Sequence, residues 1–401
     1  MDVSSENFSV SPEQQAKFYA QSGSQVKLPN KFSNKKYIAF GVLASLVLIT
    51  IFLFILVKRG GSTILSPIAD RVSDLGKSNA NMVTNPLNGE LVKDTDAAVW
   101  KDERPIAVMI NNYTDARPQS GLEKADLVYE IVAEGGITRF LAFFLSEVPD
   151  KIGPVRSTRE YYLVLVKELG DAMIMHIGWS PQALEAIETW PVRSLGRGGA
   201  QFWRDQARID AGIAIEHTAY VNGPELRELG HELGWEGEHS FVEWKFKDTE
   251  DVDKSQQCLV GECDKPITID FWYEGDYSAI FKYDRNTNTY LRFTGYDTSG
   301  SPVPHIDQES KQQISVKNLI VQFVAEVAIG GDEKNRLEYE LVGSGEAIIF
   351  TDGKATKATW SKAGRDDRTL YYDSNGQEIL FNRGQIWVSI VPDRNIEQVV
   401  Y

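Results

Sequence analysis

The feature that most constrains the fold is a series of short apolar runs between residues 104 and 162, separated by polar loops. Each run has the length of a buried strand and is bounded by turn residues. The runs are Ile106–Ile110, Leu127–Val132 and Phe140–Leu145. Farther along the chain, Ser180 and Pro181 have the pattern of a capped helix start. Strands followed by capped helices predict a mixed α/β layered domain over residues 86–245.

A second domain is predicted over residues 265–392, where many short β-type runs alternate with turn clusters. Asp352-Gly353 and Asn375-Gly376 are strong signals for two-residue hairpin loops. A polar and acidic stretch near residues 248–257 separates this region from the first domain. We therefore expect an α+β chain, with a mixed α/β N-terminal domain and a mostly β C-terminal domain.

A membrane anchor is predicted near the N-terminus. The stretch Tyr37–Val57 contains no charged residue, and about 20 apolar residues are enough to cross a bilayer as a helix. Residues 1–36 are rich in Ser, Gln and Asn, which predicts a disordered tail. Four lysines between positions 27 and 36 favour a cytoplasmic N-terminus. We thus expect a single-pass protein of the cell membrane with a linker over 58–85 and its domains on the extracytoplasmic side.

Charge and cysteine content restrict the partners and cofactors. The formal net charge is -15, which disfavours nucleic acid and anionic lipid surfaces as partners. Cys258 and Cys263 lie close together in a polar segment, and outside the cytoplasm such a pair predicts a disulfide. His231 and Glu232 begin a zinc-protease pattern whose second histidine is missing, so we predict no metal site. The chain has no phosphate-loop or dinucleotide motif, and we expect no cofactor.

Polar side chains gather at the ends of the predicted strands, where a rigid sheet presents binding groups. Guanidinium groups among them favour a phosphate or carboxylate ligand. The predicted ligand contacts are Asn111, Arg117, Arg139, Arg156 and Arg159. The alternative is that each arginine pairs with a nearby acid, such as Glu134, and has a structural role.

Three residues are weak candidates for general acid–base catalysis. Glu130 and Glu134 have an even spacing on one predicted strand, so we expect their side chains on the same face. His176 lies at the end of another predicted strand and would complete such a site. Trp179, in the loop that follows His176, is a candidate for ligand binding.

Several motifs, in order along the chain, resemble those of a known family. They are Arg104–Asn112, Ala116–Leu122, Glu134–Arg139, Gly153–Ser157, Gly343–Gly345 and Gly384–Trp387. Together they resemble the YerB-like bacterial lipoproteins, a two-domain family of unknown function. The resemblance implies an α+β extracytoplasmic protein held at the membrane, and it implies no activity. This chain has a predicted membrane span where that family commonly has a lipid-modified cysteine. It also has Glu216-His217-Thr218 where relatives tend to have Pro-His-Asn.

Three functional hypotheses follow from these patterns. The first is a membrane-anchored cell-envelope protein that binds an anionic envelope ligand or a partner protein of the envelope. The second is an envelope-acting phosphoryl or glycosyl transferase or hydrolase that uses Glu130, Glu134 and the arginine cluster. The third is an assembly scaffold whose β-rich domain carries the partner contacts. We favour a binding protein over an enzyme because the chain lacks a nucleophile motif and a metal motif.

Overall fold

The computed structural model describes residues 82–236, 241–248, 257–258, 261 and 263–401. The predicted tail 1–36, the predicted span Tyr37–Val57 and most of the linker 58–85 lie outside these residues. Across the described ranges, no helix combines the length and the apolar composition that crossing a membrane requires. Residues 78–401 form one compact unit with a continuous buried core.

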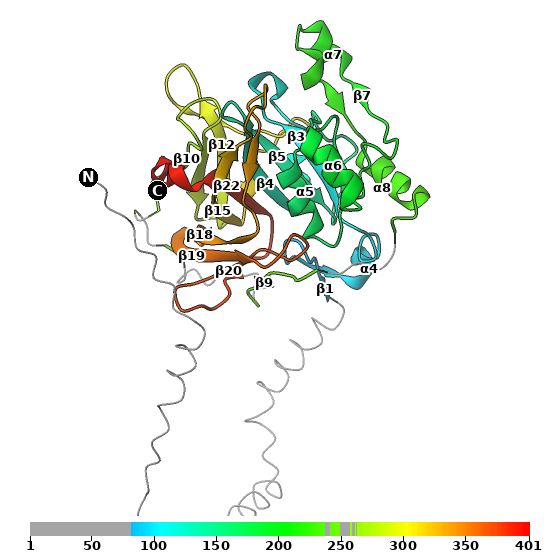
Figure 1. Cartoon of the computed structure of the whole chain (residues 1–401). Helices are drawn as coiled ribbons and strands as arrows, with labels where there is room; N and C mark the ends of the chain where they lie inside the picture. Colours follow the sequence, from blue (N-terminus) through cyan, green and yellow to red (C-terminus); the bar gives the residue numbers. More distant parts are fainter. Residues whose placement is uncertain (1–81, 237–240, 249–256, 259–260, 262) are drawn as a thin grey trace, which may run out of the picture. The chain divides into compact units, whose positions relative to one another are not determined.

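The centre of this unit is a mixed nine-stranded sheet (Figure 1). In spatial order its strands are β20 (Leu370–Tyr372), β19 (Lys354–Lys362), β18 (Gly343–Thr351), β15 (Asn318–Val324), β22 (Ile386–Pro392), β4 (Leu127–Glu134), β5 (Ile137–Phe144), β3 (Ile106–Asn111) and β6 (Met173–Met175). Strand β22 pairs in parallel with both β15 and β4. Because β4 belongs to the predicted first domain and β22 to the second, the two predicted domains meet within one sheet.

A second, six-stranded sheet is antiparallel throughout. Its strands are β13 (Pro302–Pro304), β12 (Thr289–Tyr296), β11 (Ala279–Asp284), β10 (Ile267–Ile269) and β23 (Val399–Val400), with β14 (Ser315–Val316) paired to β12. Phe281 of β11 contacts Trp387 of β22, and Arg292 of β12 reaches Glu130 of β4. One face of the large sheet therefore packs against the small sheet.

The opposite face of the large sheet is covered by helices α5 (Glu160–Lys167) and α6 (Pro181–Thr189), which lie over β3, β4 and β5 in Figure 1. The hydroxyl groups of Tyr161 and Tyr162 in α5 donate to main-chain carbonyls of β4. With both faces covered, β3 and β22 are buried along their whole length. Helix α6 begins as predicted, because the Ser180 hydroxyl accepts a hydrogen bond from the amide of Ala183.

The remaining strands of the described residues are short. Four two-stranded ladders pair β1 (Met82–Thr84) with β2 (Leu91–Lys93), β7 (Trp203–Arg204) with β8 (Ala219–Tyr220), β9 (Lys245–Phe246) with β21 (Leu380–Phe381), and β16 (Glu326–Ala328) with β17 (Leu337–Tyr339). The other helices are α4 (Asp94–Ala97), α7 (Gln206–Asp210) and α8 (Gly223–Glu232). The 3-10 segments are η1 (Thr114–Ala116), η2 (Leu122–Lys124), η3 (Ile215–His217) and η4 (Asp393–Gln398).

The two predicted hairpin signals have different outcomes. Asp352 and Gly353 both have positive φ and form the two-residue loop between β18 and β19, as predicted. Asn375 and Gly376 lie instead in a longer loop, which is closed where Tyr372 pairs with Glu378. The side chain of Asp373 accepts hydrogen bonds from the amides of this loop, so it orders a turn of more than two residues.

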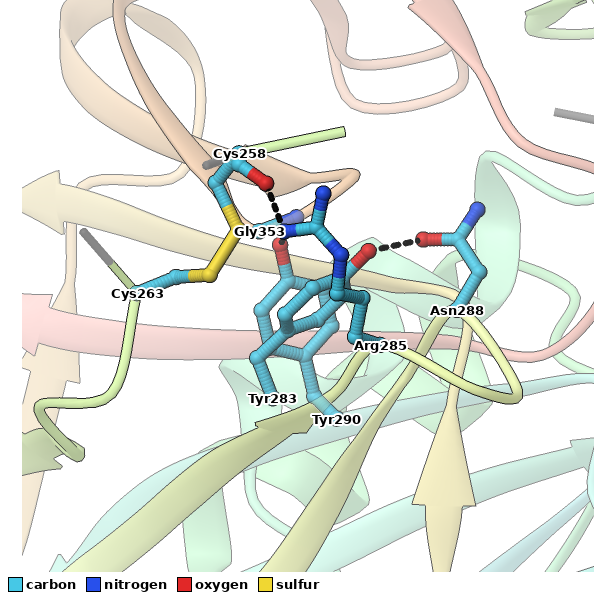
Figure 2. Close-up of a disulfide and its surroundings, with 7 residues drawn as sticks. All are labelled: Cys258, Cys263, Tyr283, Arg285, Asn288, Tyr290 and Gly353. Atoms are coloured by element: carbon cyan, nitrogen blue, oxygen red, sulfur yellow. Dashed lines mark hydrogen bonds between the residues drawn. A yellow bond between two sulfur atoms is a disulfide. The ribbon is translucent and has the colours of Figure 1, made fainter. Parts of the chain in front are cut away.

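Cys258 and Cys263 form a disulfide (Figure 2), with their Cα atoms 6.2 Å apart. The Arg285 guanidinium donates to the carbonyl of Cys258, and the Cys258 amide donates to the carbonyl of Asp352. A Cβ atom at Gly353 would lie 2.3 Å from the sulfur of Cys258, so only glycine permits this approach. The disulfide is thereby fastened to the turn between β18 and β19.

Candidate functional site

The segment from Gly153 to Arg159 lies beside the end of β3 and organises the candidate site. Its main chain exchanges hydrogen bonds with both neighbours: Arg156 donates to Met109, Asn111 donates to Pro154, and Val155 donates to Ala219. A Cβ atom at Gly153 would lie 2.8 Å from the carbonyl oxygen of Ala219. The close packing therefore requires glycine and holds the following arginines at the edge of the sheet.

Arg159 of this segment and Arg139 of β5 share one carboxylate. Arg139 donates from Nη2 to Oε2 of Glu134 at 2.8 Å, and Arg159 donates from Nε to Oε1 of the same group at 2.6 Å. Both arginines are buried, and burial followed by the charge of Arg159 lowers the pKa of Arg139. One negative charge thus lies between two positive charges. The alternative of structural pairing describes these two side chains well, although the pairing leaves a positive charge uncompensated.

Arg156 differs from its two neighbours. Its side chain is half-buried, and among the described residues its guanidinium donates no hydrogen bond and forms no ion pair. Burial lowers the pKa of Arg156, while the charges of Glu216 and Glu134 oppose this effect. A guanidinium carries five N–H donors, and within the described residues none of those of Arg156 is used.

A histidine that the sequence did not single out as a site residue lies beside Arg156. Asn111 accepts the amide hydrogen of Tyr113 through Oδ1, so its Nδ2 must be the group that faces Nδ1 of His217, at 2.7 Å. Nδ1 of His217 is therefore an acceptor, and the proton of the neutral ring lies on Nε2. Tyr113 stacks on the His217 ring with centroids 4.6 Å apart. Burial, followed by the charge of Arg156, lowers the pKa of His217 and keeps the ring neutral.

Nε2 of His217 makes no hydrogen bond within the described residues, yet it is not among the polar atoms sealed in the interior. It is thus an accessible N–H donor close to Arg156. The charges that act on Arg156 come from Glu134, Glu216, Arg159 and Arg204. With Arg139 and Arg156 included, four arginines face two carboxylates, which is a local positive charge in a chain whose net charge is -15. The arrangement suits an anion.

Arg117 is not part of this cluster. It donates from Nε to Oδ1 of Asn112 at 3.1 Å and from Nη2 to the carbonyl of Asp276 at 2.8 Å. It therefore lies on the side of the six-stranded sheet, and the guanidinium carbon lies 5.4 Å from the ring centre of Tyr277. Burial, followed by the charge of Arg292, lowers the pKa of Arg117 to about 10. The structure thus does not bring Arg117 together with the other arginines, because the loop after β3 turns it toward the second sheet, and its role as a ligand contact stays a prediction.

Glu130 and Glu134 do not form a pair of carboxylates. The register between β4 and β5 shifts between Val132 and Glu134, so the even spacing no longer places the two side chains on one face. Glu130 is fully buried and accepts two hydrogen bonds from Nη2 of Arg292, each 2.9 Å long. Trp387 and Thr138 donate to the same carboxylate. Glu130 is therefore a core residue that joins the two sheets.

Both ring nitrogens of His176 have hydrogen-bond partners within the fold. Its Nδ1 lies 2.9 Å from the carbonyl of Gly178, and its Nε2 lies 2.8 Å from the hydroxyl of Ser194. Burial lowers the pKa of His176 to about 4, which keeps the ring neutral. The loop that it holds exposes 41% of Trp179, and Trp179 pairs with Thr158 beside the arginine cluster. Trp179 thus remains a binding candidate, while His176 positions its loop.

Comparisons with known proteins place these elements in a family. Residues 88–236 match the N-terminal domain, and residues 267–388 the C-terminal domain, of a protein family of unknown function (DUF3048). The chain is 29% identical to YerB of Bacillus subtilis (strain 168), described as a lipoprotein, over 73% of this chain and 82% of that protein. The crystal structure of YerB from Bacillus subtilis superposes with a TM-score of 0.63, at 27% identity, covering 79% of this chain and 99% of that one. Since both domains match in order over more than half of its residues, the chain belongs to this YerB-like two-domain family.

Proposed function

We propose that this member of the YerB-like family is a membrane-anchored, extracytoplasmic binding protein whose ligand carries a phosphate or carboxylate group. The observation that supports this proposal most directly is the guanidinium of Arg156. It is half-buried, it has no hydrogen-bond or ion-pair partner among the described residues, and it lies beside two further arginines that share a single carboxylate. Unpaired cationic groups in such surroundings are costly unless a ligand compensates them.

The expected ligand contacts come from Arg156 and His217. Arg156 supplies charge and donors in a planar array, which matches the oxygens of phosphate and carboxylate. His217 supplies a neutral N–H whose position is fixed by Asn111 and by the stacked ring of Tyr113. Arg139 and Arg159 add positive potential while they remain bound to Glu134. The roles of Asn111 and Glu134 are therefore to position neighbours rather than to touch the ligand.

A binding role is favoured over the transferase or hydrolase alternative. General base catalysis requires a group that is free to accept a proton near the substrate. Glu134 is held by two arginines, Glu130 by Arg292, and His176 by Gly178 and Ser194. Each candidate base is therefore engaged within the fold. The scaffold hypothesis rests on the β-rich half of the chain and is independent of the arginine cluster.

The membrane location rests on three observations that agree with one another. Tyr37–Val57 has the length and composition of a spanning helix. A relative that matches most of this chain is described as a lipoprotein. The disulfide between Cys258 and Cys263 is of a kind that persists outside the cytoplasm. We infer that the described unit faces away from the cytoplasm, attached through the linker 58–85.

The proposal is tested by calorimetric titration of residues 78–401, the compact unit, with phosphate, pyrophosphate and citrate. Arg156→Gln should weaken binding of the anion that binds best by at least about tenfold, since one charged hydrogen-bonding partner is typically worth about 1.5–3 kcal/mol. Arg365→Gln is the matched control, because Arg365 pairs with its exposed neighbour Asp366 and lies over the ring of Trp190, and neither of these residues belongs to the proposed site. Equal binding by both variants would refute the site, and absence of binding to every anion would favour the scaffold hypothesis.

A further inference from the structure

A projecting arm, residues 201–216, lies next to the proposed anion site, which is formed by Arg156 and His217. It contains β7, helix α7 and the start of η3, and Figure 1 shows β7 and α7 standing out from the sheets. Every residue of this arm is at least partly exposed, and α7 buries no side chain. The arm therefore adds little to the core. It is held to the rest of the unit by the β7–β8 ladder, by the ion pair of Asp205 with Lys151, and by hydrogen bonds from Arg208 to the carbonyls of Asp115 and Pro118.

The arm exposes large apolar side chains. Phe202, Trp203 and Ile215 are 44%, 40% and 59% exposed. Trp203 stacks on Tyr220, whereas Phe202 and Ile215 both adjoin Arg204 and form an exposed apolar pair, which is the kind of group that marks an interaction site. Aromatic residues together with arginine are also the composition of binding surfaces rather than of solvated loops.

This apolar group is continuous with the anion site. The guanidinium carbon of Arg204 lies 5.4 Å from the ring centre of Phe202, and the same guanidinium donates to the carbonyl of Ile215. Arg204 is also close enough to Arg156 for its charge to act on it. Ile215 precedes His217 by two positions within η3. Going outward from Arg156 and His217, a ligand would thus meet Ile215 and Phe202.

We propose that the ligand is an anionic amphiphile, a phosphate monoester with an alkyl or prenyl chain. Its headgroup binds at Arg156 and His217, and the first part of its chain lies over Ile215 and Phe202. This inference rests on the proposed function, because it assigns the headgroup to the same site. The site is expected to bind one headgroup at a time. The chain as a whole is acidic, so a surface densely covered with anionic headgroups would repel it.

The test compares two probes with the same headgroup, methyl phosphate and octyl phosphate, by calorimetric titration of residues 78–401. Octyl phosphate is used below the concentration at which it forms micelles. It should bind about 30-fold more tightly than methyl phosphate, which corresponds to two or three buried methylene groups at ~0.8 kcal/mol each. The double variant Phe202→Ser, Ile215→Ser should bind both probes equally, with unchanged affinity for methyl phosphate.

The matched control is Val327→Ser with Val342→Ser, which removes two exposed apolar side chains elsewhere on the surface. This control should keep the 30-fold preference for octyl phosphate. Loss of the preference in the control, or its persistence in the Phe202 and Ile215 variant, would overturn the assignment of the chain to the arm.

The outcomes also separate this inference from the proposed function. If methyl phosphate binds in a manner that requires Arg156 and octyl phosphate binds no more tightly, the amphiphile is refuted while the anion site stands. If neither probe binds, both proposals fall. Sedimentation with phosphatidylcholine vesicles, with and without phosphatidic acid, identifies the source of the amphiphile. Cosedimentation that requires phosphatidic acid indicates a bilayer lipid, and octyl phosphate binding without cosedimentation indicates a monomeric amphiphile.

Discussion

Two clusters of arginine and glutamate lie on the same strand, β4, and they differ in how their charges are balanced. Around Glu130, the carboxylate is bonded to one guanidinium, that of Arg292, and both side chains are fully buried, while the charge of Arg117 acts on the pair without contacting Glu130. Around Glu134, one carboxylate meets two guanidiniums, and Arg156 beside them has no partner among the described residues. A carboxylate and a guanidinium that are bonded to each other and fully buried are consistent with a structural role. An excess of one charge at a partly exposed edge is consistent with a ligand site.

The two clusters also differ in their access to solvent. The guanidinium carbon of Arg292 lies 4.6 Å from the ring centre of Trp387 and 5.2 Å from that of Phe140, so water is excluded from the pair. Such a pair is weak evidence for net stability, but loss of one partner is costly because the other charge stays buried. At the cluster around Glu134, solvent reaches the carboxylate and can screen the effect of a change in its charge.

The largest expected effect is therefore that of Glu130→Gln. It should lower the free energy of unfolding by about 3–5 kcal/mol, because it leaves the Arg292 charge buried without a counter-charge. Denaturant unfolding of residues 78–401 measures this value. Glu134→Gln, on the same strand, serves as the matched comparison. A smaller loss for Glu130→Gln than for Glu134→Gln would break the distinction between the two clusters.

A second buried cluster gives an intermediate effect that depends on pH. Burial alone would raise the pKa of Glu168, but Lys362 and Arg368 outweigh it and lower the pKa from 4.5 to about 2. Because the folded pKa is below the unfolded one, the stabilisation is complete above about pH 4.5 and is lost as the pH falls toward 2.

The difference in unfolding free energy between the wild-type chain and Glu168→Gln should thus shrink as the pH is lowered from 6 to 3. Denaturant titrations at both pH values measure it. A difference that stays constant over this range would mean that Glu168 is not held ionised by its two cationic neighbours.

The smallest expected effect on stability is that of Glu134→Gln, at about 1–2 kcal/mol. The same change should increase the affinity for phosphate severalfold, since it raises the local charge by one unit. A substitution that lowers the stability but raises the affinity for phosphate distinguishes a ligand site from a structural ion pair. If the variant binds phosphate more weakly, Glu134 contributes to binding directly and the assignment of its role must change.

Much of the fold near the site follows from local sequence patterns. The apolar runs that predict strands correspond to β3, β4 and β5, with ends that differ by a few residues. The start of α6 at Ser180 is also confirmed. In contrast, Ser157 and Glu160 have the three-residue spacing of a capping box, but α5 has Arg159 at its N-cap, and the Ser157 hydroxyl donates to the carbonyl of Ile177. A local capping pattern failed there because a tertiary partner was available.

The parts that could not be predicted depend on distant contacts. The parallel pairing of β22 with β4 leaves no periodic signal in either segment. The contact of Asn111 with His217 joins residues 106 positions apart, so neither residue indicates the other. The shift of register after Val132 likewise has no clear sign in the sequence and moved Glu134 away from Glu130. Arg139, Arg156 and Arg159 do lie together, because the segment that carries Arg156 and Arg159 runs beside the end of β3, where β3 pairs with Arg139 of β5.

The position of β22 between β15 and β4 has a consequence for biosynthesis. Strand β4 is translated long before residues 386–392, and until those residues exist its outer edge has no neighbour in the sheet. An unpaired, apolar strand edge invites pairing with another chain. We therefore expect the nascent protein to need protection, by a chaperone or by delayed folding, until β22 has been made. The two family domains are separate in sequence, but they are expected to mature as one.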